Sequence, residues 1–164
     1  MPGPCYCTTR GTVVQDQVQQ RQRAPSLAAA ISLLAAGEGA LAVAELQALR
    51  TTSPHLLGPG EDHYWLGLAY LLAFDWSAAI HELRAYLARE ASGWRAGWAY
   101  LHLGRAYEQS GLVDEASLAY RGCLGCAGSE RAARRLAFDL MSRLASSLPM
   151  GYGQASTRSP EGRP

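Results

Sequence analysis

The sequence predicts an all-α protein, a solenoid of three helical hairpins closed by a C-terminal helix. Leucine- and alanine-rich segments with apolar residues three and four positions apart fill the middle of the 164-residue chain, as amphipathic helices require. β-Branched residues are scarce, and no alternating strand pattern occurs. The same residue pattern also returns at an offset of 37 residues, which indicates a repeat architecture.

The repeated unit is visible in residues of the same kind that coincide at this offset. The coinciding pairs are Gly67 with Gly104, Tyr70 with Tyr107, and Ala79 with Ala116. A further step back reaches Ala30 and Ala42, which are also small. We therefore expect three copies of one unit, at about residues 23–56, 60–93 and 97–130.

Each copy has the pattern of two helices around a short turn. Asp114 and Glu115 support this in the third copy, because acidic residues at a helix start interact favourably with the helix dipole. Glycine- or proline-rich linkers at 56–62 and 91–97 separate the copies. The predicted turns and second helices are 37–39 followed by 40–50, 73–75 followed by 76–89, and 110–111 followed by a helix from 113.

A last amphipathic helix is predicted over residues 129–148. Ser129 is a suitable N-cap, and the leucines at positions 136, 140, 144 and 148 form one apolar stripe. The arginines at positions 131, 134, 135 and 143 lie mostly off that stripe, which provides the polar outer face that a capping helix needs. Residues 1–23 and 149–164 are expected to be a flexible extension and a flexible tail on either side of a repeat domain at 24–148.

Two of the copies carry a short motif around the repeated glycine. The motif is LGLAY at 66–70 and LGRAY at 103–107, each followed by an alanine twelve residues after the glycine. This pattern resembles the tetratricopeptide repeat (TPR) family, although the period of 37 residues exceeds the roughly 34 residues typical of that family. The resemblance implies a right-handed α-solenoid of three TPR-like hairpins with a capping helix, acting as a scaffold or adaptor.

The resemblance also implies where a partner would bind. In this family the first helix of each unit lines a concave groove, and we expect the groove here to receive an apolar or aromatic segment of another protein. A second copy of the chain, or residues 1–23, could fill the groove instead. The residues expected to contact the partner are Tyr64, Leu68, Leu71, Leu72, Trp98, Leu101, Arg105 and Glu108.

Other function classes find less support. Catalytic motifs such as HExxH, GxSxG and the Walker loop are missing, and the histidines at 55, 63, 81 and 102 are scattered. Neither catalysis nor a cofactor is therefore expected. The net charge of +1 and the pI of about 7.7 exclude a strongly basic nucleic-acid binder, and the arginines of 129–148 leave phosphate contacts as a weaker alternative.

The cysteines and the longest apolar stretch bear on metal binding and location. Cys5, Cys7, Cys123 and Cys126 could form a four-thiolate zinc site, but CxC spacing suits zinc poorly and 116 residues separate the pairs. We therefore expect no metal. Residues 27–36 are too few to span a bilayer, and residues 1–23 show no signal-peptide pattern. A soluble, cytoplasmic chain is expected.

Overall fold

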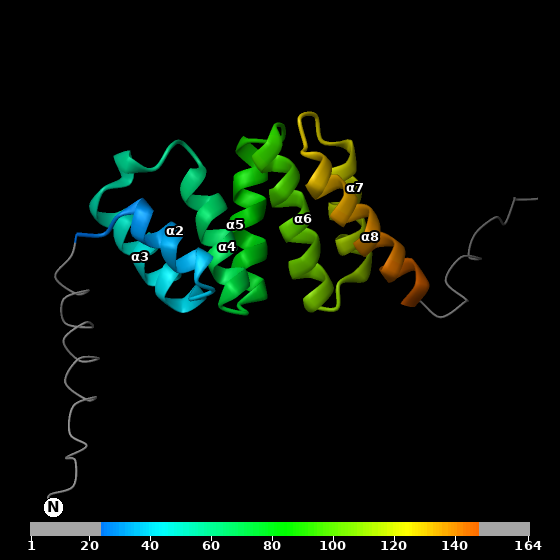
Figure 1. Cartoon of the computed structure of the whole chain (residues 1–164), viewed down its shortest axis with the longest axis horizontal. Coiled ribbons are helices and arrows are strands. Elements are labelled where there is room, and N and C mark those ends of the chain that lie inside the picture. The colour runs from blue at the N-terminus through cyan, green and yellow to red at the C-terminus, as the bar shows by residue number, and fades with distance from the viewer. Residues whose placement is uncertain (1–23, 148–164) are drawn as a thin grey trace, which may run out of the picture.

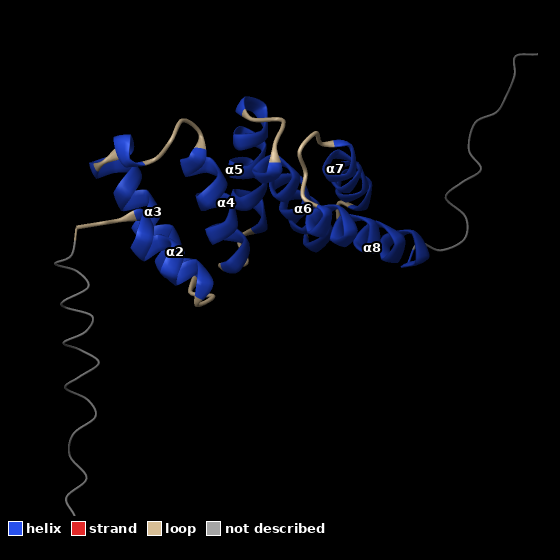
Figure 2. Ribbon diagram, turned by 45° about the horizontal axis from the view of Figure 1, so that its top comes forward, coloured by secondary structure: helices blue, strands red, loops and turns tan. Residues whose placement is uncertain are grey.

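The structure is a computed structural model that describes residues 24–147. Over these residues it contains helices and loops without strands (Figures 1 and 2). The predicted extension at 1–23 and tail at 149–164 lie outside the described residues. The elements are α2 (Leu27–Ala35), α3 (Gly39–Thr52), the short 3-10 helix η1 (Pro54–Leu56), α4 (Glu61–Leu72), α5 (Trp76–Arg89), α6 (Trp94–Gln109), α7 (Val113–Gly125) and α8 (Arg131–Ser147).

The helices form three successive hairpins followed by α8, and each helix packs mainly against its neighbours in the chain. Figure 1 shows the pairs α2/α3, α4/α5 and α6/α7 side by side along the long axis of the molecule. The all-α prediction and the three helix pairs are confirmed. None of the described helices is long and apolar enough to cross a bilayer.

The three hairpin turns occupy equivalent positions. Gly37, Phe74 and Gly111 lie 37 residues apart, and their φ angles are +79°, +60° and +75°. Glycine adopts this left-handed conformation freely, whereas a bulky side chain is strained there. The backbone therefore repeats even where the residue type does not, and Phe74 has a strained conformation.

Side-chain caps explain where two of the helices begin. The Ser26 hydroxyl accepts a hydrogen bond from the Ala29 N–H at the start of α2, and an Asp75 carboxylate oxygen accepts one from the Ala78 N–H at the start of α5. Each bond satisfies a donor that the first turn of a helix leaves free.

The core consists of three apolar clusters, each shared by successive helices. The N-terminal cluster joins α2, α3 and α4, the central cluster joins α4 to α7, and the C-terminal cluster joins α6, α7 and α8. Their buried members are Ala30, Ala42, Leu46, Leu66 and Ala69; Tyr64, Leu83, Tyr86, Leu87, Ala96, Ala99, Leu103 and Ala119; and Leu101, Ala116, Tyr120, Cys123, Ala133, Ala137 and Leu144.

The repeated glycines allow the two helices of a hairpin to approach closely. The side chains that contact these glycines are larger than the repeated alanines at positions 79 and 116. A Cβ at Gly67 would lie 2.6 Å from Cγ of Leu83, and a Cβ at Gly104 would overlap the ring of Tyr120. Leu83 and Tyr120 thus occupy the space that the missing side chains leave free. They are four residues beyond the repeated alanines, which is one helical turn.

The start of the last helix differs from the prediction. Helix α8 begins at Arg131, and the carbonyl of Glu130 accepts the first helical bond, from the N–H of Arg134. Ser129 is therefore not its N-cap. A Cβ at Gly97 would clash with the Ser129 side chain, so this residue closes the contact between α6 and the loop before α8.

Candidate interaction surface

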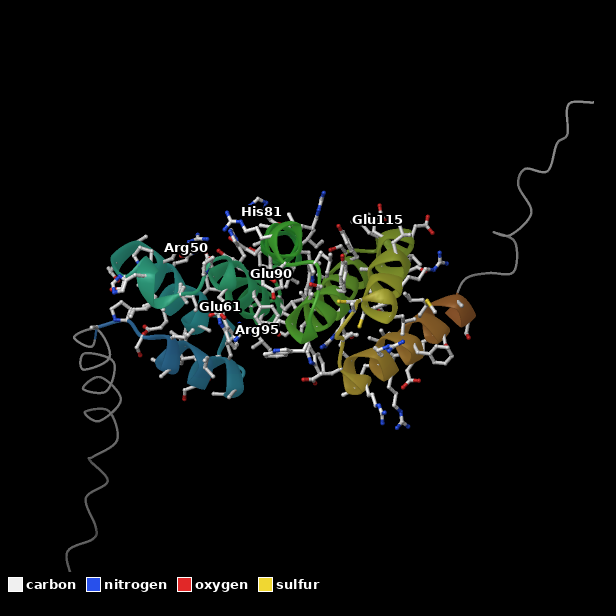
Figure 3. The ribbon with its side chains drawn as sticks, turned by 90° about the horizontal axis from the view of Figure 1, so that it is seen from above. Arg50, Glu61, His81, Glu90, Arg95 and Glu115 are labelled. Atoms are coloured by element: carbon white, nitrogen blue, oxygen red, sulfur yellow. The ribbon has the colours of Figure 1, made fainter. Side chains whose placement is uncertain are left out.

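The first helices of the hairpins share one side of the molecule. Direct contacts join α2 to α4, α4 to α6 and α6 to α8, while among the described helices no comparable contact joins α3 to α5 or α5 to α7. In the view of Figure 3, α2 and α8 lie on one side and α3, α5 and α7 on the other. Because the first helices approach one another more closely, this side is the inner one. We call it the inner face.

One strip of equivalent residues on the inner face combines exposed residues with partly buried ones, the latter being Trp65, Leu68 and His102. Its members recur at the 37-residue offset and are spaced three and four residues apart within each helix, so they lie on one side of each helix. Ile31 is 40% exposed and Leu72 is 38% exposed. This inner strip consists of Ala28, Ile31 and Ala35 on α2, Trp65, Leu68 and Leu72 on α4, and His102, Arg105 and Gln109 on α6.

The composition of the inner strip changes along the molecule. On α2 it holds only alanine and isoleucine, on α4 it holds tryptophan and leucine, and on α6 it holds histidine, arginine and glutamine. The strip is therefore apolar over its first two helices and polar over the third.

Two tryptophans and an arginine link α4 to α6 beside the strip. The guanidinium carbon of Arg95 lies 5.0 Å from the ring centroid of Trp94 and 6.0 Å from that of Trp65, within the range of cation–π attraction. Arg95 also forms an ion pair with Glu61 at the start of α4. Figure 3 shows Glu61, Glu90 and Arg95 close together.

A pocket of about 310 Å³ opens beside this ion pair. It lies where the linker before α4 meets the linker before α6, and Trp94 at its rim is 49% exposed. The pocket combines aromatic rings, carboxylates and the guanidinium group. Its lining residues are Gly58, Pro59, Glu61, Tyr86, Glu90, Ser92, Gly93, Trp94 and Arg95.

A stacked pair of aromatic rings continues the inner face on α6. The rings of Trp98 and His102 lie 5.9 Å apart at an interplanar angle of 25°, and Nε1 of Trp98 donates a hydrogen bond to Glu130 over 3.2 Å. Burial, and to a smaller extent the nearby Arg105, lowers the pKa of His102 to about 4. The imidazole is therefore neutral at physiological pH.

Two polar atoms of the inner strip lack a partner. Nε1 of Trp65 and Nδ1 of His102 are buried, and no hydrogen bond reaches either atom within the described residues. A buried polar group without a partner costs roughly 1–3 kcal/mol. Burying these two atoms therefore costs free energy of folding, and both belong to residues of the inner strip.

Half of the predicted contact residues lie on the inner face. Leu68, Leu72 and Arg105 belong to the inner strip, and Trp98 lies one helical turn before His102. Leu71 is half-buried and packs against the central cluster.

The other predicted contact residues do not face open solvent. Tyr64 is 5% exposed in the central cluster and Leu101 is 2% exposed in the C-terminal cluster, so the structure corrects their predicted place in an open groove. Glu108 accepts a hydrogen bond from the Tyr120 hydroxyl at 2.7 Å. One position along a helix turns a side chain by about 100°, which separates Tyr64 from Trp65 and Leu101 from His102.

The sequence patterns did not single out Trp65, Arg95 or His102 as candidate site residues. The repeat itself could have identified Trp65 and His102, because they are equivalent at the offset of 37 and share a helix face with Leu68 and Arg105 respectively. Nothing in the sequence pairs Arg95 with Glu61, 34 residues away.

The cysteines within the described residues are Cys123 and Cys126, and both are free thiols. Burial raises the pKa of the Cys123 thiol, as expected for a residue on the buried face of its helix. Within residues 24–147 no group of three or more histidine, cysteine or acidic side chains is arranged to hold a metal, and Cys5 and Cys7 lie outside that range.

Comparison of the chain with protein-family models, curated proteins and solved structures gives no match.

Proposed function

We propose that this chain is a non-catalytic protein–protein interaction module, a right-handed solenoid of the TPR type. Its inner face binds an apolar or aromatic segment of another protein. The observation that carries this proposal is the inner strip, where Ile31 and Leu72 are exposed and where Trp65 and Leu68 are only partly buried. Large accessible apolar patches on soluble proteins mark contact sites.

The polarity of the strip suggests how a partner is oriented. An apolar stretch would cover Ile31, Leu68 and Leu72, and an acidic group at one end would meet Arg105. Trp65 provides a rigid aromatic contact of the kind that dominates interface energetics.

His63 takes part in an ion-pair network between helices. His63 holds Glu82 through a 2.6 Å contact between Nδ1 and Oε2, and Arg50 pairs with the same carboxylate at 3.4 Å. This network ties α3, α4 and α5 together.

We include a cytoplasmic location in the proposal, because a reducing compartment keeps free thiols such as Cys123 and Cys126 reduced.

The test uses a peptide library selected on the full chain, followed by affinity measurements with one selected apolar peptide. Changing Leu68 and Leu72 to Glu places two charges on the inner strip, and binding should weaken by at least about tenfold. The control is Leu118→Glu, which introduces one such charge on α7 at an exposed leucine, and should leave affinity unchanged. Equal affinity in all variants would refute the inner face as the binding site.

A second candidate is that the apolar half of the face is occupied by the chain itself. The observation in its favour is α2, which exposes Ile31 and contains no charged side chain. Light scattering on the full chain and on residues 24–164 separates the two candidates. A monomer in both cases supports an external partner. Self-association of the full chain that Leu68→Glu with Leu72→Glu abolishes, or aggregation only after truncation, supports self-occupation.

A further inference from the structure

The three hairpin turns form one edge of the molecule. Figure 1 shows the turns between α2 and α3, α4 and α5, and α6 and α7 along its lower side. The turn segments are 35–41, 72–77 and 109–115, and we call them the turn edge. They contain no basic residue and four acidic ones, Glu38, Asp75, Asp114 and Glu115.

The turn edge also exposes apolar side chains. Phe74 is 75% exposed, and Leu41 and Leu112 are 52% and 42% exposed. The positions equivalent to Phe74 in the other two hairpins are Gly37 and Gly111, which adopt positive φ without strain. Phe74 is therefore unfavourable in the isolated chain for two reasons. Its backbone conformation is strained, and its apolar ring is exposed to water.

Helix α8 presents a surface with the opposite charge. Its exposed side carries two large apolar residues, Phe138 at 57% and Leu136 at 46% exposure. Within residues 24–147 no ion pair joins an arginine of this helix to a carboxylate. The charged residues between its ends are Arg131, Arg134, Arg135, Arg143 and Asp139.

Helix α8 does not reach the first two turns of its own chain. Helix α8 packs only against α6 and α7, with Ala133, Ala137 and Leu144 turned toward them. Its outer side therefore faces away from the hairpins. Figure 1 shows α8 at one end of the molecule, whereas the turns of the first two hairpins lie toward the other end.

We propose that the outer side of α8 docks on the turn edge of a second copy of the chain. Arginines would meet the acidic residues of the turns, and Phe138 would pack with Phe74. The contact joins two different surfaces, so it is heterologous, and each bound copy still presents a free turn edge and a free α8. The chain thus associates head to tail, and it does so without using the inner strip.

Charge reversal on the two surfaces tests this pairing. The full chain is studied by sedimentation velocity over a range of concentrations. The variant Glu38→Arg with Asp114→Arg, and the variant Arg131→Glu with Arg135→Glu, each place like charges opposite each other. Each should weaken self-association by at least about tenfold. An equimolar mixture should associate again, because the reversed surface of each variant is complementary to a surface of the other.

Matched variants separate this contact from general effects of charge and fold. Arg84→Glu with Arg121→Glu makes the same change in net charge as the α8 variant, at exposed positions of α5 and α7, and should leave association unchanged. Phe74→Gly removes the apolar contact at a position whose equivalents are glycine, so it should weaken association without lowering the melting temperature. Leu68→Glu with Leu72→Glu, which tests the inner face, should not alter association.

Three results would overturn the proposal. The first is a full chain that stays monomeric at every concentration. The second is an association that survives both charge reversals or is not restored by mixing the variants. The third is a monomeric chain whose α8 arginines instead bind single-stranded DNA in a salt-dependent way, which would assign this surface to nucleic acid.

Discussion

His102 shows how far the tertiary environment changes a single residue. In the unfolded chain its pKa is that of an ordinary histidine, near 6.5, and in the folded chain it is about 4 because the ring is buried. The folded form therefore excludes a proton that the unfolded form accepts. This difference links the stability of the whole chain to pH.

We predict that His102 makes the protein less stable as the pH falls from 6.5 toward 4. Above pH 6.5 neither state is protonated and the residue has no effect, whereas between the two pKa values only the unfolded state binds the proton. The loss in unfolding free energy should reach about 2–3 kcal/mol by pH 4.5.

Urea denaturation at pH 7, 5.5 and 4.5 measures this loss, and His102→Gln should remove it. Carboxylates also destabilise the fold in acid, so the comparison that matters is the difference between variants. His81→Gln is the control, because His81 is exposed on α5 (Figure 3). If the wild-type and His102→Gln proteins lose stability in parallel, the histidine is not the cause.

At the scale of the elements, the closeness of paired helices depends on glycines. In the α6/α7 pair, the ring of Tyr120 lies where a side chain at Gly104 would be. The Tyr120 hydroxyl is held by Glu108, and burial raises the pKa of the phenol. The ring is thus fixed at both ends and has little freedom to move aside.

We predict that Gly104→Ala destabilises the protein by about 1–3 kcal/mol, because the added methyl group overpacks the α6/α7 contact. The higher helix propensity of alanine, about 1 kcal/mol, offsets only part of this loss. Gly125→Ala is the control, since a Cβ there has no atom within 4 Å. Thermal or urea denaturation gives both values. An equal or higher stability of Gly104→Ala would show that the helices can separate without penalty.

At the scale of the whole molecule, stability comes from clusters that each join three or four successive helices. In such a linear arrangement every hairpin depends on its neighbours. The central cluster shares α4 with the N-terminal cluster and shares α6 and α7 with the C-terminal cluster. The C-terminal cluster lies at one end of the molecule. Damage at the two places should therefore spread differently.

We predict that Leu83→Ala lowers the stability of every helix, by about 2–5 kcal/mol, whereas Leu144→Ala mainly loosens α8. Leu83 is fully buried in the central cluster, and Leu144 is 8% exposed at the end of the array. Native-state hydrogen exchange resolves the two cases helix by helix. Uniform loss of protection in Leu144→Ala would mean that the array unfolds as one unit.

The residues expected at the binding surface illustrate what sequence patterns can resolve. Leu68, Leu72 and Arg105 lie on the inner face, and the helical period and the repeat offset both place them on one side of their helices. Tyr64 and Leu101 were assigned to the same face, since in a helix that contacts neighbours on several sides most positions are apolar. The pattern alone does not distinguish a residue that faces a neighbouring hairpin from one that faces the inner side.

The sequence by itself determined the all-α class, the three helix pairs, the positions of their turns and the 37-residue period. These features depend on local propensity and on spacing within the chain, which neighbouring residues encode. Only the tertiary structure decided which side of each first helix stays accessible, which side chains fill the space beside Gly67 and Gly104, and that Arg95 pairs with Glu61. Those outcomes depend on how residues 16 to 34 positions apart in the chain approach each other, and a shift of one residue, which turns a side chain by about 100°, changes them.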